Sequence, residues 1–413
     1  MPFSLIRHAF RRRPLPRFMP PPVERKSHYD VLIIGGGGHG LACAYYLAKQ
    51  HGIRKVAVVD RSWLGGGNTA RNTAIIRANY LTAEAIRFYG ESMRLYQNLS
   101  AELDYNLLYS PRGHLTLAHT DAACRTARWR ANMNRHLGED SRFVTRPEIA
   151  ELCPQLNMSI SARYPILGGL YHPPGAIARH DAVAWGYAAR AAQMGVSIFP
   201  KTEVVGILQS GGKVTGAKLA DGGTIHADAV VQAVAGQTSQ VAAMAGFTTP
   251  IMSVPLQAMV SQPLAPFLHP IIVSGSLHTY ISQSARGELV MGGSVDPWVL
   301  HAPRSTLHFK QSLAGNILQL FPFLGGVRLL RQWAGVADMT ADFSPLMGKT
   351  PLENYYLDAG WGTWGFKATP ICGVMLAELV AGGKTPELIA PYAMSRFDDL
   401  SLVGEKGAAS VGH

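Results

Sequence analysis

The sequence predicts an α/β fold (α+β overall) built from two interleaved domains, and three observations lead to this prediction. The chain has 413 residues, roughly two to three times the length of an ordinary domain, so a single core is not expected. Residues 28–48 read as a strand, a glycine-rich turn and a helix in direct succession. Residues 224–236 predict a buried parallel strand much later, as expected where the chain returns to the first sheet. Together these features predict a Rossmann-like nucleotide-binding domain interleaved with a strand-rich substrate-binding domain.

The composition is that of a globular protein. Hydrophobic residues make up 47% of the chain and charged residues 16%, whereas disordered chains combine low hydrophobicity with high net charge. Four cysteines are too few for a disulfide scaffold, and they form no Cys-x-x-Cys pair, which disfavours structural zinc and a redox dithiol. We therefore expect no metal site and a reducing, cytoplasmic location. The cysteines are Cys43, Cys124, Cys153 and Cys372.

The N-terminal segment and the overall charge restrict the partners that are expected. Residues 1–28 form a basic, proline-rich arm without the apolar segment and cleavage site of a secretory signal. The formal charge is +11, but beyond Arg11–Arg13 the cations are dispersed and no nucleic-acid-binding motif accompanies them. No uninterrupted apolar run reaches the about 18 residues of a membrane-spanning helix, and the nearest candidate, residues 314–330, is broken by polar residues and glycines. We therefore expect neither nucleic acid nor a membrane as a partner.

The N-terminal strand, His28–Ile34, runs directly into a glycine-rich turn with the pattern Gly-x-Gly-x-x-Gly. The first glycine permits the tight turn, the second lets the backbone approach a pyrophosphate, and the third lets the helix pack on the strand. A second strand, Lys55–Val59, ends at an acid about 20 residues beyond the motif, where a carboxylate is expected to bind ribose hydroxyl groups. The motif alone fits both FAD and NAD. The expected contacts are Gly35, Gly37, Gly38, Gly40 and Asp60.

The segment after the second strand favours FAD over NAD. Residues 65–77 are polar and rich in glycine, which suits a backbone wrapped around an extended flavin nucleotide. Nicotinamide dehydrogenases have no reason to carry such a segment at this point. The FAD contacts expected from it are Gly66, Asn68, Thr69, Arg71, Asn72 and Thr73.

Seven passages in collinear order resemble one known family, the glycine and sarcosine oxidase group of flavin amine oxidases, and within it the β subunits of heterotetrameric sarcosine oxidases. The resemblance covers essentially the whole chain from Tyr29 to His413. Seven collinear matches are far more specific than the dinucleotide motif alone. The passages are residues 29–49, 65–80, 178–186, 255–261, 278–283, 344–350 and 360–370.

The resemblance implies a β subunit that binds FAD noncovalently and oxidises a secondary amino acid there, with sarcosine giving glycine and a one-carbon unit. Electrons are implied to pass to a covalent FMN near the interface with a larger α subunit, and then to oxygen. The α subunit would carry NAD and a folate-handling domain, and two small subunits would complete the hetero-oligomer. Two alternatives stay open: a dehydrogenase subunit for N-methylglutamate or another secondary amino acid, and a flavin electron-transfer or assembly subunit without its own substrate.

His180 matches the histidine to which the family attaches FMN. The attachment needs a neutral imidazole nitrogen that attacks the 8α-methyl group of the flavin, and the neighbouring Arg179 and Asp181 are placed to bias its protonation. The alternative is an ordinary histidine at a helix N-terminus. His172 is the fallback attachment residue.

Arg77 and Lys367 match the two cations that bind the substrate carboxylate in the family. A guanidinium group and a second cation would fix that carboxylate so that the N-methyl carbon faces N5 of the flavin. The alternatives are that Arg77 contacts an FAD phosphate and that Lys367 caps a helix or a carbonyl group. Tyr280 and His278 resemble residues of the substrate pocket, and strand alternation predicts that both lie on one face of a strand.

The segment before Lys367 is expected to be a loop whose backbone amides stabilise charge on the reduced flavin. Three departures from the family bear on the substrate. Trp364 stands where glycine is usual and puts a large indole beside the expected flavin, and Val254 stands where histidine is common, while residues 171–177 replace a segment rich in arginine and glycine. The cofactor contacts expected from the loop are Gly360, Gly362, Thr363, Gly365 and Lys367.

The FAD-binding domain is predicted to be discontinuous, with the substrate-binding domain filling the gaps in the sequence. Helices are predicted over Asp121–Leu137, Asp181–Met194 and Ile371–Ala381. The predicted boundaries are 29–105, 176–248 and 338–400 for the FAD-binding domain, 106–175 and 249–337 for the substrate-binding domain, and 401–413 for a surface tail.

Overall fold

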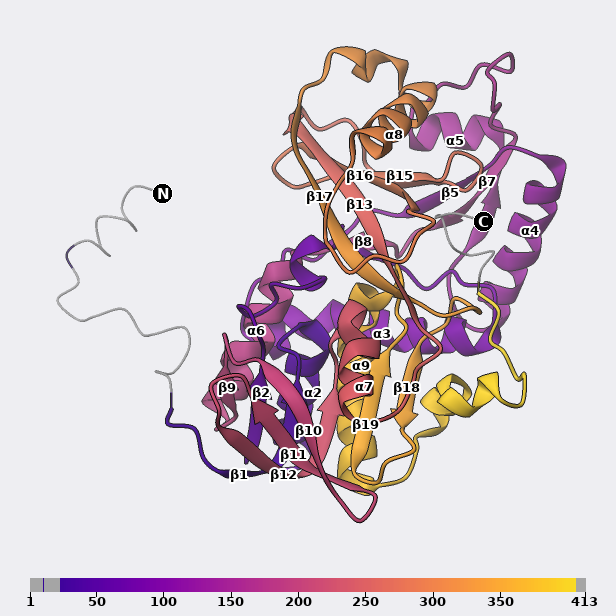
Figure 1. The fold of residues 1–413 in the computed structure, drawn as a ribbon. Coiled ribbons are helices and arrows are strands. Elements are labelled where there is room, and N and C mark those ends of the chain that lie inside the picture. The colour runs from indigo at the N-terminus through magenta and orange to yellow at the C-terminus, as the bar shows by residue number, and fades with distance from the viewer. Residues whose placement is uncertain (1–9, 11–22, 406–413) are drawn as a thin grey trace.

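The computed structural model describes Phe10 and residues 23–405. Two large sheets, each of eight strands, organise the chain. The first sheet lies in the lower half of Figure 1 and the second in the upper half, with helices packed on both. The predicted α/β fold is confirmed, because parallel strands and helices alternate in the lower half while antiparallel strands dominate the upper half.

The first sheet has a parallel core in the order β9-β2-β1-β12-β19. Antiparallel strands extend it, because β10 and β11 lead into the start of β12, and β18 pairs with β19. Its strands are β1 (His28–Ile34), β2 (Val56–Val59), β9 (Ser197–Phe199), β10 (Val204–Ser210), β11 (Lys213–Leu219), β12 (Thr224–Gln232), β18 (Leu346–Lys349) and β19 (Tyr355–Ala359).

Both faces of this parallel core are buried, which explains why its strands are continuous apolar runs. Val31 and Ile33 of β1 point into a core shared with helices, while Leu32 and Ile34 point into a core shared with β10 and β11. A short helix, α7 (Thr238–Met244), follows β12. The helices on the first face are α2 (Gly38–Gln50), α3 (Ala83–Glu102), α6 (His180–Gln193) and α9 (Gly365–Gly382).

The second sheet has the order β17-β13-β16-β15-β14-β5-β7-β6 and is antiparallel except where β14 pairs with β5. Helices α4 (Asp121–His136), α5 (Arg146–Leu152) and α8 (Leu307–Leu320) pack on it. Its strands are β5 (His114–Ala118), β6 (Arg142–Val144), β7 (Gly168–His172), β13 (Met252–Pro263), β14 (Ile271–Ser274), β15 (Thr279–Gln283), β16 (Glu288–Val295) and β17 (Leu329–Met339).

The remaining elements are short. A third sheet joins β3 (Ile75–Ile76), β8 (Ala176–Ile177) and β4 (Ser110–Pro111). The predicted domain boundaries stay a prediction; strands of the first sheet lie before residue 60, between residues 197 and 232, and after residue 345. The single-turn helices are η1 (Thr69–Arg71), η2 (Ala235–Gln237), η3 (Pro322–Gly326), η4 (Glu387–Tyr392) and η5 (Met394–Phe397).

The helix predicted over Ile371–Ala381 starts six residues earlier, at Gly365, so that prediction was too short. In the sequence, Pro370 predicts a break in the helix because proline has no N–H group. The Phe366 carbonyl, four residues earlier, would therefore have no helical partner. The structure supplies another donor: the Tyr96 hydroxyl donates to the Phe366 carbonyl at 2.6 Å. In the same way, the Ser92 hydroxyl donates to the Lys367 carbonyl at 2.6 Å. The start of α9 is therefore stabilised by α3.

Helix α9 is the one described helix that is long and apolar enough to cross a membrane, whereas the sequence pointed to residues 314–330 as the nearest candidate. Sixty-seven per cent of α9 is buried inside the protein. It packs against α2 and α3, so its apolar character is that of a core helix.

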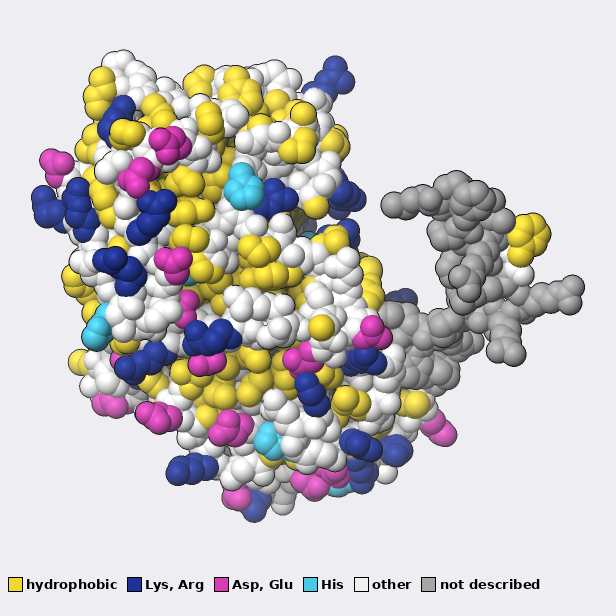
Figure 2. Space-filling model, turned by 180° about the vertical axis from the view of Figure 1, so that it is seen from behind, with side chains coloured by type: hydrophobic (Ala, Val, Ile, Leu, Met, Phe, Trp, Pro, Cys, Tyr) yellow, Lys and Arg dark blue, Asp and Glu magenta, His cyan; other side chains and the backbone are white. Residues whose placement is uncertain are grey.

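The two ends of the chain are described only in part. Most of the predicted basic arm, including Arg11–Arg13, lies outside the described residues, and Arg25 forms an ion pair with Asp221 at 2.8 Å. Of the predicted tail, residues 401–405 are described, and their assignment to the surface is wrong for Glu405. Its buried carboxylate accepts hydrogen bonds from the Leu81 and Thr82 amides just before α3. On the face in Figure 2, basic side chains are scattered and many lie next to acidic ones.

Replacing Tyr96 by Phe should lower the free energy of unfolding by about 1–3 kcal/mol, because it leaves the buried Phe366 carbonyl without a donor. In a Pro370→Ala background, residue 370 regains its N–H group. Replacing Tyr96 by Phe should then lower the free energy of unfolding by a smaller amount. Urea unfolding of the four proteins of this double-mutant cycle is the measurement. Equal losses in both backgrounds would contradict the role given to Tyr96.

Candidate functional site

A cleft with a volume of about 390 Å³ opens at the carboxyl ends of β1, β2 and β12. Ligands of open parallel sheets bind at this edge, where neighbouring strands lead to opposite connections. The cleft is lined by the ends of these strands, by residues 66–72 and by residues of the segment before α9. Its volume and its position suit a dinucleotide such as FAD.

The glycine-rich turn forms one wall of this cleft. Gly35 has φ +116°, and a Cβ atom there would collide with the Ala233 carbonyl oxygen. A Cβ at Gly40 would collide with the Gly35 carbonyl oxygen, so Gly40 lets the helix pack on the strand. Gly37 and Gly38 line the cleft at the N-terminus of α2, where the helix dipole favours a phosphate.

Asp60 lies at the end of β2 and lines the same cleft. Its two carboxylate oxygens accept hydrogen bonds from the Gly36 and Ser62 amides, both at 2.8 Å. A carboxylate has about four lone-pair directions, so these bonds orient the group and leave acceptors for ribose hydroxyl groups. Asp60 therefore also holds the glycine-rich turn in place.

The loop after β2 is held mainly by its own polar side chains. Asn68 donates to the Val336 carbonyl at 2.6 Å and accepts from the Val336 amide at 3.0 Å. Arg71 donates to the carbonyl groups of Gly66 and Gly67. The Thr69 hydroxyl accepts the Gly38 amide at 3.0 Å. These side chains fix the shape of the cleft, and the predicted residues that line it here are Gly66, Asn68, Thr69, Arg71 and Asn72.

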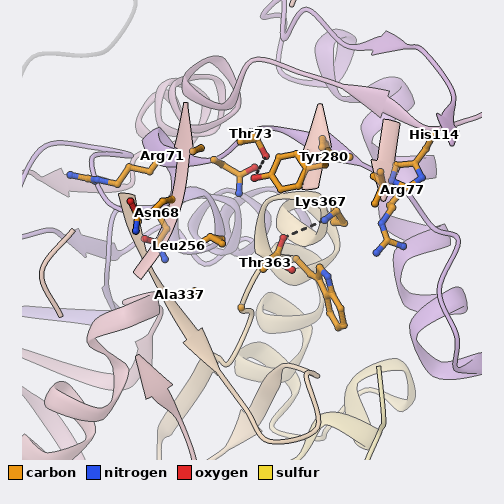
Figure 3. Close-up of a pocket in the computed structure, with 18 residues that line it drawn as sticks. Asn68, Arg71, Thr73, Arg77, His114, Leu256, Tyr280, Ala337, Thr363 and Lys367 are labelled. Carbon is orange, nitrogen blue, oxygen red and sulfur yellow. Dashed lines mark hydrogen bonds between the residues drawn. The ribbon is translucent and has the colours of Figure 1, made fainter. Parts of the chain in front are cut away.

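A smaller pocket with a volume of about 90 Å³ adjoins the cleft, because Asn68, Arg71, Asn72 and Gly362 line both. Figure 3 shows Tyr280 and Lys367 in the middle of this pocket, with Arg77 and His114 together at one end. Its lining residues include cations and no aspartate or glutamate. The pocket therefore suits a small anion next to the dinucleotide cleft.

Lys367 lies in the first turn of α9 and is 6% exposed. Its Nζ donates to the Thr363 carbonyl at 3.4 Å, which is a long hydrogen bond. Burial, and then the positive charge of Arg77, lowers the pKa of Lys367 well below its ordinary value. The negative charge of a carboxylate bound in the pocket would raise the pKa of Lys367 and so offset both effects.

Arg77 is buried and comes directly after β3. Its guanidinium group donates to the backbone carbonyl of Asn79 at 3.1 Å and to its side-chain oxygen at 3.0 Å, and it lies over the Tyr80 ring at 4.3 Å from the centroid. Arg77 lines the small pocket and not the dinucleotide cleft. Its position therefore favours the carboxylate role over the FAD phosphate role.

Sequence reasoning missed His114, which lines the small pocket and is 2% exposed. Burial, followed by Arg77 and His172, lowers the pKa of His114 well below 6.5, so the ring is neutral. Among the described residues, nothing hydrogen bonds to its Nδ1 atom. The residue belongs to no motif; its place depends on the pairing of β5 with β14, where it lies opposite Ile271.

Tyr280 lines the pocket, and its hydroxyl accepts a hydrogen bond from Thr73 Oγ1 at 3.3 Å. The prediction that His278 shares a strand face with Tyr280 is wrong. Strand β15 begins at Thr279, and His278 has φ +43°, so the alternation of an extended strand does not reach it. His278 is half-buried and does not line the pocket.

The segment before α9 is shaped by Asp338. Its carboxylate accepts the Gly360 amide at 2.7 Å, and its backbone carbonyl accepts the Gly362 amide at 2.9 Å. Burial raises the pKa of Asp338 to about 7. Gly362 and Gly365 line the dinucleotide cleft, Thr363 lines the small pocket, and Gly360, with φ +70°, lines neither.

Trp364 does not fill the pocket. It is 4% exposed, forms part of the pocket wall and packs edge-on against Tyr80 at 5.3 Å between ring centroids. The indole therefore narrows the site and leaves a cavity in which Lys367 and Tyr280 are accessible.

His180 is the first residue of α6 and lines neither cavity. Among the described residues its Nδ1 atom has no hydrogen-bond partner, and burial lowers its pKa below 6.5, with Asp181 opposing that shift. The ring is therefore neutral, as attachment of a flavin requires. Arg179 donates to Asp181 at 2.9 Å, so these neighbours bind each other.

His172, the fallback attachment residue, is buried completely. Its Nδ1 atom is 2.6 Å from the Asp140 carbonyl, and its Nε2 atom accepts the Ala78 amide at 3.3 Å. Both ring nitrogens are thus occupied, which excludes His172 as an attachment point.

The comparison with known proteins agrees with this geometry. Residues 30–379 match the family described as FAD dependent oxidoreductase. Proteins named sarcosine oxidase subunit beta are 45% identical in Arthrobacter sp and 43% identical in Rhodobacter capsulatus. These alignments cover 96% and 94% of this chain, and 98% and 94% of the relatives.

Two solved structures are similar over most of this chain. L-proline dehydrogenase from P. horikoshii has a TM-score of 0.85 at 27% identity and covers 91% of this chain and 100% of its own. Glycine oxidase from Geobacillus kaustophilus has a TM-score of 0.81 at 23% identity, covering 90% and 99%, and shows the shared fold. The chain therefore belongs to the FAD-dependent oxidoreductase family, and within it to the flavin amine oxidoreductases of the sarcosine oxidase β-subunit group. The resemblance seen in the sequence is confirmed.

The lowered pKa of Lys367 predicts how carboxylate binding depends on pH. A carboxylate binds the protonated amine better, so its dissociation constant should rise as the pH increases through the lowered pKa of Lys367. Titrating the FAD-loaded protein with a small carboxylate such as methylthioacetate between about pH 6 and pH 10, followed by flavin absorbance, measures this. The Lys367→Met variant should bind weakly at every pH; an unchanged pH dependence in that variant would assign the titration to another group.

Proposed function

We propose that this chain oxidises sarcosine at a noncovalently bound FAD. The observation that carries the proposal is the small, buried pocket without acidic residues that adjoins the dinucleotide cleft and contains Arg77, Lys367 and His114. A buried ammonium group such as that of Lys367 is costly unless an anion compensates it. The carboxylate of a small amino acid supplies that anion, and relatives named sarcosine oxidase subunit beta support the choice.

The roles of the side chains follow from their positions in the pocket. Arg77 and Lys367 bind the carboxylate, and the neutral ring of His114 offers a third polar contact at the same end. Tyr280 lies beside Lys367 in the middle of the pocket (Figure 3), and its hydroxyl accepts a hydrogen bond from Thr73. The chemistry that FAD would supply when bound is to accept a hydride from the substrate carbon next to the amine. The substrate leaves as an imine, which water converts to glycine and formaldehyde, or to a one-carbon unit captured on folate.

The volume of the pocket favours sarcosine over larger secondary amino acids. One water-sized group needs about 10–15 Å³ by this measure, so about 90 Å³ accommodates roughly six to nine such groups. This suits sarcosine better than N-methylglutamate, whose second carboxylate would have to pass Trp364. The same cavity argues against a subunit that only transfers electrons, because such a subunit has no need of a cationic pocket beside its flavin.

We further propose that His180 carries a covalent FMN that receives electrons from FAD and passes them to oxygen. The neutral, unpaired Nδ1 atom of His180 supports this role. So does the packing of α6 on the loop that lines the dinucleotide cleft, where a Cβ at Gly65 would lie 3.2 Å from that of Ala184. A larger α subunit with NAD and a folate-handling domain, and two small subunits, would complete the complex. The free, buried cysteines support a cytoplasmic location.

Anaerobic mixing of the assembled, FAD-loaded complex with sarcosine should bleach its flavin absorbance faster than mixing with N-methylglutamate or proline. Arg77→Met should lower kcat/KM for sarcosine by more than about 100-fold and leave the FAD content unchanged, because it removes a charge-assisted contact to the substrate alone. Loss of FAD from this variant would place Arg77 at the cofactor. If kcat/KM for either larger substrate exceeded that for sarcosine by more than about tenfold, the assignment of sarcosine as the substrate would be wrong. A tenfold difference corresponds to about 1.4 kcal/mol of transition-state binding.

Acid precipitation of the active complex should release FAD and leave FMN on the protein. Mass spectrometry of the peptide that contains His180 should then show the added mass of one FMN. His180→Ala is the matched variant and should keep FAD while losing the bound FMN. An unmodified His180 peptide from the active complex would contradict the assignment of the covalent FMN to His180.

A further inference from the structure

His39 lies inside the glycine-rich turn, where its side chain is 13% exposed and lines the dinucleotide cleft. The ring bridges two elements that are far apart in the sequence. Its Nδ1 atom is 2.7 Å from Oδ2 of Asp358, the residue before the end of β19, and its Nε2 atom is 2.7 Å from the carbonyl oxygen of Gly365. Trp361 packs edge-on against the ring at 4.9 Å between centroids.

Both partners of His39 are hydrogen-bond acceptors, and this fixes the protonation of the ring. A neutral imidazole has one N–H group and one lone pair. With a carboxylate at one nitrogen and a carbonyl oxygen at the other, a neutral ring would place a lone pair against an acceptor at 2.7 Å. Both contacts are favourable when the ring carries two N–H groups, which is the imidazolium form.

The surroundings of the ring support this form. Burial by itself would lower the pKa of His39, but Asp358, the Gly365 carbonyl and Asp338 outweigh it and raise the pKa above 6.5. The groups that face the pair are Asp338 from β17 and Cys372 from α9. Asp358 also accepts the Trp361 Nε1–H at 2.9 Å, as expected for a carboxylate.

The same contacts exclude a metal at this cluster, although the ligand atoms of His39, Asp358 and Cys372 lie within 4.8 Å of one another. Both nitrogens of His39 are already engaged. Burial raises the pKa of the Cys372 thiol well above its ordinary value, which disfavours a thiolate at this position.

We propose that His39 is a constantly protonated imidazolium that joins the N-terminus of α2 to that of α9 and neutralises the Asp358 carboxylate, which lines the FAD cleft. The ion pair stands between the turn that faces the pyrophosphate and the segment that carries Gly362, so without the imidazolium the Asp358 carboxylate would repel an anionic part of FAD. FAD has two anionic parts on which His39 can act, the pyrophosphate and the reduced flavin. His39 is in this view a positioning residue for α9 as well as a cofactor contact.

The first test is the protonation state itself. In the FAD-loaded protein with ¹⁵N-labelled histidine, both nitrogens of His39 should give the signals of protonated nitrogens at about pH 8, where exposed histidines are neutral. Asp358→Asn is the matched variant, because its amide would donate to Nδ1 and its oxygen would still accept from Trp361. In that variant Nδ1 should lose its proton. An unprotonated Nδ1 in the unchanged protein would overturn the proposal, since the shared proton would then reside on Asp358.

The second test is the effect of the charge on the cofactor. His39→Gln should weaken FAD binding to the apoprotein at least tenfold, while His39→Lys, which keeps a cation that only donates, should stay within about threefold of the unchanged protein. If ADP binding falls in parallel, the charge acts on the pyrophosphate. If ADP binding is unchanged and the midpoint potential of FAD falls, it acts on the reduced flavin. Equal FAD affinity and potential in all three proteins would overturn the proposal.

Discussion

The start of helix α9 is the point on which the candidate site depends. Its first turn carries Lys367, the segment before it carries Gly362, and the Gly365 carbonyl binds His39. Pro370 deprives this turn of one of its own hydrogen bonds, and α3 replaces it through Tyr96. Because one short stretch contributes to the pocket, to the dinucleotide cleft and to the glycine-rich turn, the three cannot be positioned independently.

Charge distribution separates the two cavities. The dinucleotide cleft is bounded by Asp60, Asp338 and Asp358, each of which accepts hydrogen bonds from nearby groups, whereas no lining residue of the small pocket is acidic. The acids therefore act as acceptors that orient backbone and ring N–H groups. The small pocket combines Arg77 and Lys367 with a lining that contains no carboxylate, which suits an anionic ligand.

Local sequence signals identified the residues whose roles follow from backbone conformation. Gly35 and Gly40 were predictable because a turn of this shape excludes a Cβ atom, and Lys367 was found through a passage that resembles a family. His114 was not predictable, because its place is set by the pairing of β5 with β14, and one histidine in an unassigned segment carries no signal. The prediction for His278 was wrong because it applied the side-chain alternation of a strand to His278, whose own φ is positive.

The order in which the chain supplies its core has a consequence for biosynthesis. Helix α2 is made early and is almost entirely apolar where it is buried, yet a main partner, α9, is made near the end of the chain. Strand β19, which completes the parallel core beside β12, is equally late. During synthesis the surface of α2 that faces α9 and the open side of β12 therefore stay uncovered until nearly the whole chain has been made, and such exposed apolar surface and unpaired strand edges favour aggregation.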